Sequence, residues 1–90
     1  MQNEIKKPVN LIIDIGNTSA KLAVFSQGEM KEIVRTSNQT LEGLGALCQQ
    51  YPIRKGIWSS VISLNEEMNQ QLEQLPFPMM EFTYKTPVPV

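Results

Sequence analysis

An apolar run near the start of the chain dominates its hydrophobic pattern. Apolar side chains fill odd and even positions of Val9–Ile15, which predicts a strand buried on both faces. The pair Gly16-Asn17 readily accepts positive φ and favours a two-residue hairpin turn. A second strand is expected at about residues 19–26, and alternation predicts a third at about residues 30–36.

Helical spacing of apolar residues follows the third strand. The predicted apolar stripe consists of Leu41, Leu44, Leu47, Cys48 and Tyr51. Thr40 is a plausible N-cap, and Pro52 ends the helix. Gly43 and Gly45 weaken it by roughly 1 kcal/mol each relative to alanine. We expect these glycines to let the helix pack closely on the sheet.

The remainder of the chain predicts a strand, a helix and a strand. The fourth strand is expected at about residues 55–62, and Ser63 with Glu66 fits a capping box. The apolar face of the second helix consists of Met68, Leu72 and Leu75. A short fifth strand is expected at about residues 79–84.

This order of elements indicates one α/β domain. Three strands joined by short turns form an antiparallel meander, and the later connections are long enough for crossovers. Right-handed crossovers place strands four and five parallel to strand one. The mixed five-stranded sheet then has the order 3-2-1-4-5, with two helices and with strand one central. The turn after strand one lies at the carboxyl edge, where open α/β sheets bind ligands.

A carboxylate, Asp14, interrupts the first apolar run. Burying it is costly without compensation, and the next residues can supply that compensation. Gly16 allows close backbone approach to a ligand, while Asn17 and Thr18 offer hydrogen bonds. Lys21 adds a positive charge.

A phosphate held at this turn would be repelled by the neighbouring carboxylate. The repulsion is about 4 kcal/mol at about 4 Å and an effective dielectric constant of about 20. A divalent cation between the two groups reverses the sign, so the residues indicate phosphate with Mg²⁺. Because Asp, Gly and Asn are also ordinary hairpin residues, a plain hairpin in a small structural domain is the alternative.

The string from Asp14 to Thr18, followed by Lys21, resembles the first phosphate loop of type III pantothenate kinases. These enzymes belong to the actin, sugar-kinase and Hsp70 ATPase superfamily. The resemblance implies a ribonuclease-H-like, actin-like ATPase half-domain over residues 1–90. By position, Asp14 would hold Mg²⁺ or its water shell. Gly16 and Asn17, together with Thr18, would contact the ATP phosphates, and Lys21 would neutralise them.

The resemblance also implies an activity. Type III pantothenate kinases transfer the γ-phosphoryl group of ATP to pantothenate in coenzyme A biosynthesis. They act as homodimers and require Mg²⁺ and a monovalent cation, K⁺ or NH₄⁺. Their later Gly-x-Asp-Arg string, which carries the catalytic base, and their second phosphate loop do not occur in this chain. The resemblance thus implies an N-terminal fragment without catalytic residues or a second domain, inactive alone. A weaker likeness covers residues 59–62, where Ser59 and Ser60 are more simply strand residues.

Composition narrows the partners and the compartment. The 90 residues suit one small domain, and the net charge of -1 with no basic block argues against nucleic-acid or membrane-surface binding. The absence of histidine excludes histidine triads and histidine metal sites from this chain. The single cysteine, Cys48, fits a reducing compartment, and no apolar run approaches the roughly 20 residues of a membrane helix. We expect a cytoplasmic location, and Arg35 is expected to be simply solvated.

Two other functions are compatible with the same sequence features. A sugar kinase or an exopolyphosphate phosphatase also begins with Asp-x-Gly, although Asn17 and Thr18 after the glycine favour the pantothenate family. A regulatory accessory protein linked to transcription is a non-enzymatic reading. The near-neutral charge argues against direct DNA contact by such a protein.

Overall fold

The computed structural model describes residues 8–82. Its elements are β1 (Val9–Ile15), β2 (Ala20–Ser26), β3 (Glu29–Thr36), α1 (Leu44–Gln50), β4 (Ile53–Ser60), α2 (Glu66–Glu73) and β5 (Met79–Glu81). The five strands form one sheet in the order β3-β2-β1-β4-β5. β1 is central, antiparallel to β2 and parallel to β4. The predicted α/β class, mixed sheet and strand order are therefore confirmed, and they are consistent with the actin-like ATPase half-domain.

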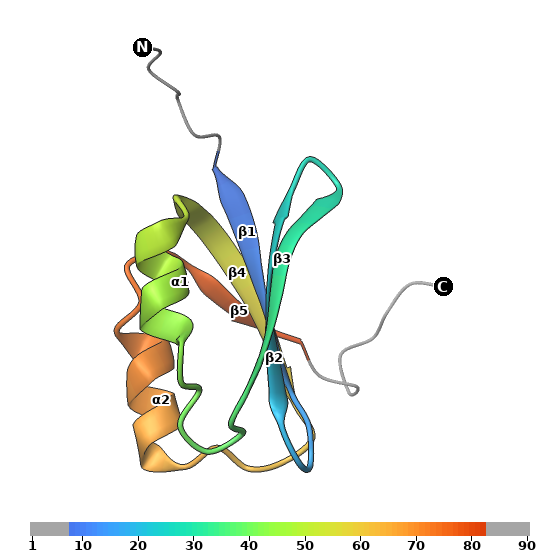
Figure 1. The fold of residues 1–90 in the computed structure, drawn as a ribbon. Coiled ribbons are helices and arrows are strands. Elements are labelled where there is room, and N and C mark those ends of the chain that lie inside the picture. Colours follow the sequence, from blue (N-terminus) through green and yellow to red (C-terminus); the bar gives the residue numbers. More distant parts are fainter. Residues whose placement is uncertain (1–7, 83–90) are drawn as a thin grey trace.

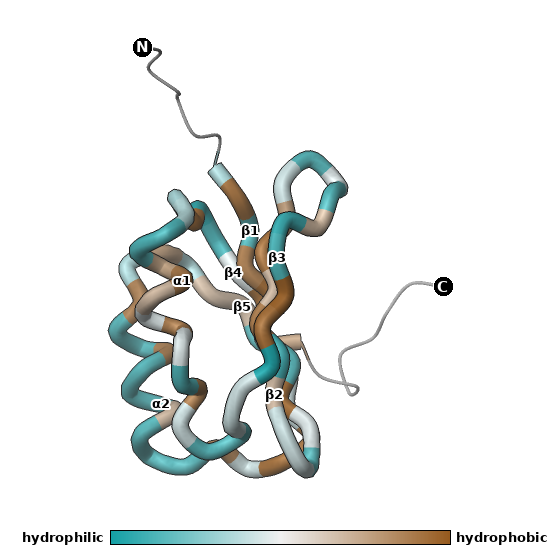
Figure 2. The backbone as a smooth tube through the Cα atoms, viewed as in Figure 1, coloured by the Kyte–Doolittle hydropathy of each residue, from teal (hydrophilic) through white to brown (hydrophobic). Residues whose placement is uncertain are grey.

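Both helices cover the same face of the sheet (Figure 1). The two crossovers, β3–α1–β4 and β4–α2–β5, step in the same direction along the sheet, and right-handed connections then place their helices on one side. The largest fully buried side chains lie in the layer between sheet and helices: Leu11, Ile13, Ile15, Leu22, Val24, Leu41, Leu44 and Met68. Figure 2 shows hydrophobic colour along the strands and hydrophilic colour over much of α2.

The expectation that β1 is buried on both faces is wrong for this structure. Its residues alternate strictly between buried and exposed, and Ile12 is 38% exposed. The helices of the described residues lie on the other side, so nothing in residues 8–82 covers the face that carries Ile12. We call this side of the sheet the open face. An apolar row crosses it in register through all five strands: Ile33, Ala23, Ile12, Ile57 and Met80.

The start of α1 differs from the prediction. The helix begins at Leu44, and its N-cap is Gly43 with φ of 96°, not Thr40. Leu41 precedes the helix with φ of 50° and is fully buried, so its apolar character reports core packing, not helical periodicity. The proposed close packing by glycines is also wrong, because a Cβ at Gly43 or Gly45 would meet no atom within 4 Å.

The start of α2 is set by a different cap from the one predicted. The side chain of Asn65 accepts a hydrogen bond from the Met68 N–H at 2.8 Å, so Ser63 is not the N-cap. β4 ends at Ser60, two residues earlier than expected. The expected end of the fifth strand, residues 83–84, lies outside the described part of the chain.

Candidate functional site

Three connections gather at one end of the sheet (Figure 1). They are the turn of residues 16–19 after β1, the loop of residues 37–43 after β3, and residues 61–65 after β4. The Val61 N–H donates to the Ile15 carbonyl oxygen at 3.0 Å, which joins the last of these to the end of β1. This is the carboxyl end of the parallel strands β1 and β4, where the sequence predicts a ligand site.

The turn after β1 has four residues, not the expected two. Ile15 pairs with Ala20, and the Gly16 N–H donates to the Ser19 carbonyl oxygen at 2.8 Å. Neither Gly16 nor Asn17 has positive φ, so the prediction that this pair forms a hairpin turn through positive φ is wrong. A Cβ on residue 16 would lie 3.2 Å from the Ser19 oxygen, closer than side chains normally approach, and glycine therefore suits the closed turn.

Asp14 lies on the open face and is exposed. The premise that its carboxylate is buried is wrong, because no helix of residues 8–82 covers that face. Its in-register neighbours are Lys21 on β2 and Ser59 on β4, and Lys21 in turn pairs with Arg35 on β3. We call Arg35, Lys21, Asp14 and Ser59 the charged row. Within the described residues the Asp14 carboxylate has no hydrogen bond and no ion pair, so it is free to interact with a ligand or cation.

The turn beside the charged row offers free backbone donors. Asn17 and Thr18 are exposed, and their N–H groups have no acceptor among residues 8–82. The Gly16 N–H is already used within the turn, so this residue can shape a phosphate site but not donate to it through its amide. Two of the three residues expected to contact phosphate therefore retain free backbone N–H groups, with the Lys21 charge on the adjoining strand.

Sequence reasoning missed two residues at this end of the sheet. Arg35 is exposed, as expected, but its register beside Lys21 was not foreseen; its period-two position in β3 was the available signal. Asn38, from the loop after β3, donates its side-chain amide to the carbonyl oxygens of Gly16 and Asn17 at 3.0 and 2.9 Å. No local sequence pattern predicts this contact.

The two serines at the end of β4 have different environments. Ser60 is engaged locally, because its hydroxyl donates to the Ile62 carbonyl oxygen at 2.6 Å and accepts from the Ile62 N–H at 3.1 Å. Its role is therefore to shape the chain after β4. Ser59, in contrast, belongs to the charged row through its register with Asp14.

The donor set suits a cation that arrives with phosphate. No group of three or more His, Cys, Asp or Glu residues in the described chain could hold a metal ion by itself. Mg²⁺ commonly uses one or two carboxylates, substrate phosphates and water. A single free carboxylate, Asp14, beside free amides and a lysine meets that requirement.

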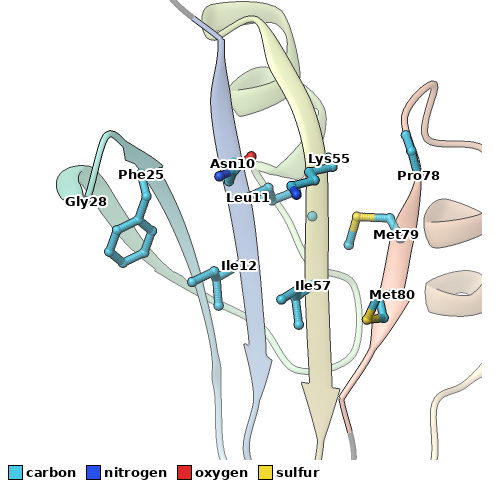
Figure 3. Close-up of a pocket in the computed structure, with 11 residues that line it drawn as sticks. Asn10, Leu11, Ile12, Phe25, Gly28, Lys55, Ile57, Pro78, Met79 and Met80 are labelled. Carbon is cyan, nitrogen blue, oxygen red and sulfur yellow. The ribbon is translucent and has the colours of Figure 1, made fainter.

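An apolar hollow of about 470 Å³ lies on the open face, around the apolar row (Figure 3). Ile12, Phe25, Ile57 and Met80 are among its lining side chains, and Lys55 lies at its edge. Asp14 does not line it. Its apolar walls do not suit phosphate, so the candidate phosphate site is the charged row and its turn, not this hollow.

Comparison with known proteins gives relatives for nearly the whole chain. It is 52% identical over 82 residues to the type III pantothenate kinase of Phocaeicola vulgatus, and 50% and 49% identical to those of two Bacteroides fragilis strains. The resemblance to type III pantothenate kinases is confirmed. Each match covers 91% of this chain but 34% of the kinase, so the chain spans about a third of these relatives' length. No family model matches the chain. No helix within residues 8–82 is long and apolar enough to cross a membrane.

Proposed function

We propose that the chain is the N-terminal, ATP-phosphate-binding part of a pantothenate kinase. The longer enzyme would transfer the γ-phosphoryl group of ATP to pantothenate in coenzyme A biosynthesis, with a second domain supplied by the rest of the protein. The relatives' names support the substrate. The observation that carries the proposal is the free, exposed Asp14 carboxylate at the carboxyl end of the central strand, in register with Lys21.

Each residue of the site has a role in this proposal. Asp14 holds Mg²⁺ directly or through its water shell, while the N–H groups of Asn17 and Thr18 donate to phosphate oxygens. Mg²⁺, when bound, would supply positive charge that offsets the repulsion between the phosphates and the carboxylate. Lys21 supplies positive charge to the phosphates. Gly16 contributes by permitting the closed turn, because its own N–H is engaged.

Phosphoryl transfer needs groups on several elements around the nucleotide. We propose that the catalytic base lies in the remainder of the longer enzyme, and that the 90-residue chain is inactive alone. We extend the proposal to a homodimer that requires K⁺ or NH₄⁺ and works in the cytoplasm, where a single free cysteine such as Cys48 stays reduced. Phosphorylation by the isolated chain would disprove the predicted inactivity.

A chimera provides the test. This chain replaces the 82 matched residues of the Phocaeicola vulgatus kinase, and ADP release is measured with pantothenate or with hexoses as acceptor, in K⁺ or in Na⁺. We expect activity with pantothenate that is higher in K⁺. Lys21→Ala should raise KM for ATP about tenfold, as expected for a lost hydrogen bond to a charged group.

Asp14→Asn should lower kcat/KM at saturating Mg²⁺, whereas Glu73→Gln is the control. Glu73 is exposed on α2, on the helix-covered side, so its variant makes the same charge change away from the open face. Equal kinetics for the Asp14, Lys21 and control variants would show that the site is wrong. Activity with hexoses and not with pantothenate would replace the proposed substrate with a sugar.

A further inference from the structure

The side chain of Asn38 joins two loops that are far apart in the sequence. Its Nδ2 lies 3.0 Å from the carbonyl oxygen of Gly16 and 2.9 Å from that of Asn17. A side-chain amide has two N–H donors, and here both are directed at consecutive carbonyl groups of the turn after β1. The contact therefore fixes two neighbouring peptide planes, not only the position of the loop.

The orientation of those peptide planes decides where the free donors point. All described peptide bonds are trans, so the C=O and N–H of one peptide point in opposite directions. The Gly16 carbonyl shares its peptide with the Asn17 N–H, and the Asn17 carbonyl shares its peptide with the Thr18 N–H. When Asn38 holds both oxygens, the two N–H groups are held pointing away from it. Both belong to the three turn amides, those of Asn17, Thr18 and Ser19, that have no acceptor among residues 8–82.

The loop that carries Asn38 is itself firmly anchored. Leu41 is fully buried in the core, and its N–H donates to the Ser37 carbonyl oxygen at 3.1 Å. From α2 and its cap, the side chains of Gln71 and Asn65 donate to carbonyl oxygens of the same loop. The loop that carries Asn38 is thus held to the core and to α2, so the Asn38 side chain is suited to hold the turn after β1 in place.

We propose that Asn38 is a positioning residue for phosphate binding. It orients the Asn17 and Thr18 N–H groups toward the phosphates and does not touch ATP itself. This inference rests on the proposed function and adds to it a residue that the phosphate-loop string does not contain. A purely structural Asn38 would instead support the stability of the loop without selective effect on phosphate.

The test compares ligands with and without phosphate. In the same chimera, Asn38→Ala removes both donors, and Asn38→Asp places a carboxylate against the two carbonyl oxygens. Gln71→Ala is the matched control, because it removes a hydrogen bond to the same loop without touching the turn. The quantities measured are KM for ATP and the inhibition constants of tripolyphosphate and adenosine, with urea unfolding to compare stabilities.

Positioning predicts selective losses. Asn38→Ala should weaken ATP and tripolyphosphate about tenfold, the scale of one hydrogen bond to a charged group, and Asn38→Asp should weaken them further. Adenosine inhibition should stay unchanged in both. Gln71→Ala should change none of the three, because buried Leu41 and the Asn65 hydrogen bond still anchor the loop. Loss of all three ligands in parallel, or of none, would overturn the role of Asn38 while leaving the proposed function in place. A chimera in which tripolyphosphate and ATP do not bind at all, beside an active parent kinase, would overturn both.

Discussion

Asp14→Asn should change ATP affinity in opposite directions with and without Mg²⁺. The substitution keeps the size of the side chain and removes its charge, and Asp14 has no partner within residues 8–82 that would be lost. Without metal, the carboxylate repels phosphate. With metal, it attracts the cation that the phosphates carry. If Asp14 acted only through hydrogen bonding or shape, the effect of the substitution on ATP affinity would have the same sign with and without Mg²⁺.

The magnitude follows from exposure. Two unit charges about 4 Å apart interact by about 1 kcal/mol in bulk water and about 4 kcal/mol at an effective dielectric constant of about 20. Asp14 is exposed on the open face, so the lower figure applies, and 1 kcal/mol is about fivefold in Kd. We therefore expect ATP in EDTA to bind the variant about fivefold more tightly. MgATP should bind it at least fivefold more weakly, because Mg²⁺ carries two charges.

Isothermal titration of the chimera with ATP measures both values, in EDTA and in excess MgCl₂. Low ionic strength is needed because exposed charges are screened over about 10 Å at 0.1 M salt. Glu73→Gln again serves as the charge-matched control and should leave both affinities unchanged. If Asp14→Asn moved both affinities in the same direction, or neither, the carboxylate would not be the group that couples cation and phosphate.

Three further predictions concern the fold. Gly45→Ala should raise the free energy of unfolding by about 1 kcal/mol in urea titrations, because the site is helical and open, whereas Gly43→Ala should lower it by about 1 kcal/mol, because φ is 96° there. The hydrogen bond from the Tyr51 hydroxyl to Glu32 raises the pKa of Tyr51. The phenol of the unfolded chain therefore ionises at lower pH than that of the folded chain, and the free energy of unfolding of the wild type should fall as pH rises above about 10. Tyr51→Phe should lack that fall. Parallel curves of unfolding free energy against pH for the two proteins over pH 8–11 would contradict the prediction. Asn65→Ala should lower the free energy of unfolding by about 1 kcal/mol, because it removes the N-cap of α2. Asn65→Asp should keep the cap and most of that stability. Equal losses in the two variants would show that the contact of Asn65 with the loop after β3 matters instead.

Strand order and the position of Asp14 in the sheet could be predicted because they follow from local patterns. Alternation in β3, the apolar run of β1 and the length of the connections through helices leave few topologies once crossovers are right-handed. The predicted bounds of β1 are the observed ones. Asp14 then falls at the end of the central strand without any knowledge of tertiary contacts.

The conformation of the turn could not be predicted in the same way. A glycine beside an asparagine permits positive φ but does not require it, and the hydrogen bond from Gly16 to Ser19 closes a four-residue turn instead. Positive φ at two consecutive residues occurs at Gln27 and Gly28, between β2 and β3. The Asn38 contact links positions more than 20 residues apart, so only tertiary structure reveals it.

The hydrophobic pattern of β1 predicted more burial than the structure has, because one side of the strand lies on the open face. The residues on that face also limit which element could cover it. The apolar row through Ile12 and the charged row through Asp14 are two residues apart along the strand, which is about 7 Å. Any element that buries Ile12 and Ile57 would gain from removing apolar surface from water. If it extended over Asp14, it would also desolvate a carboxylate that has no partner in the described chain, which is costly. Burial of the apolar row is therefore compatible with phosphate binding only if the cover ends before the charged row, which leaves Asp14 and Lys21 facing solvent and nucleotide.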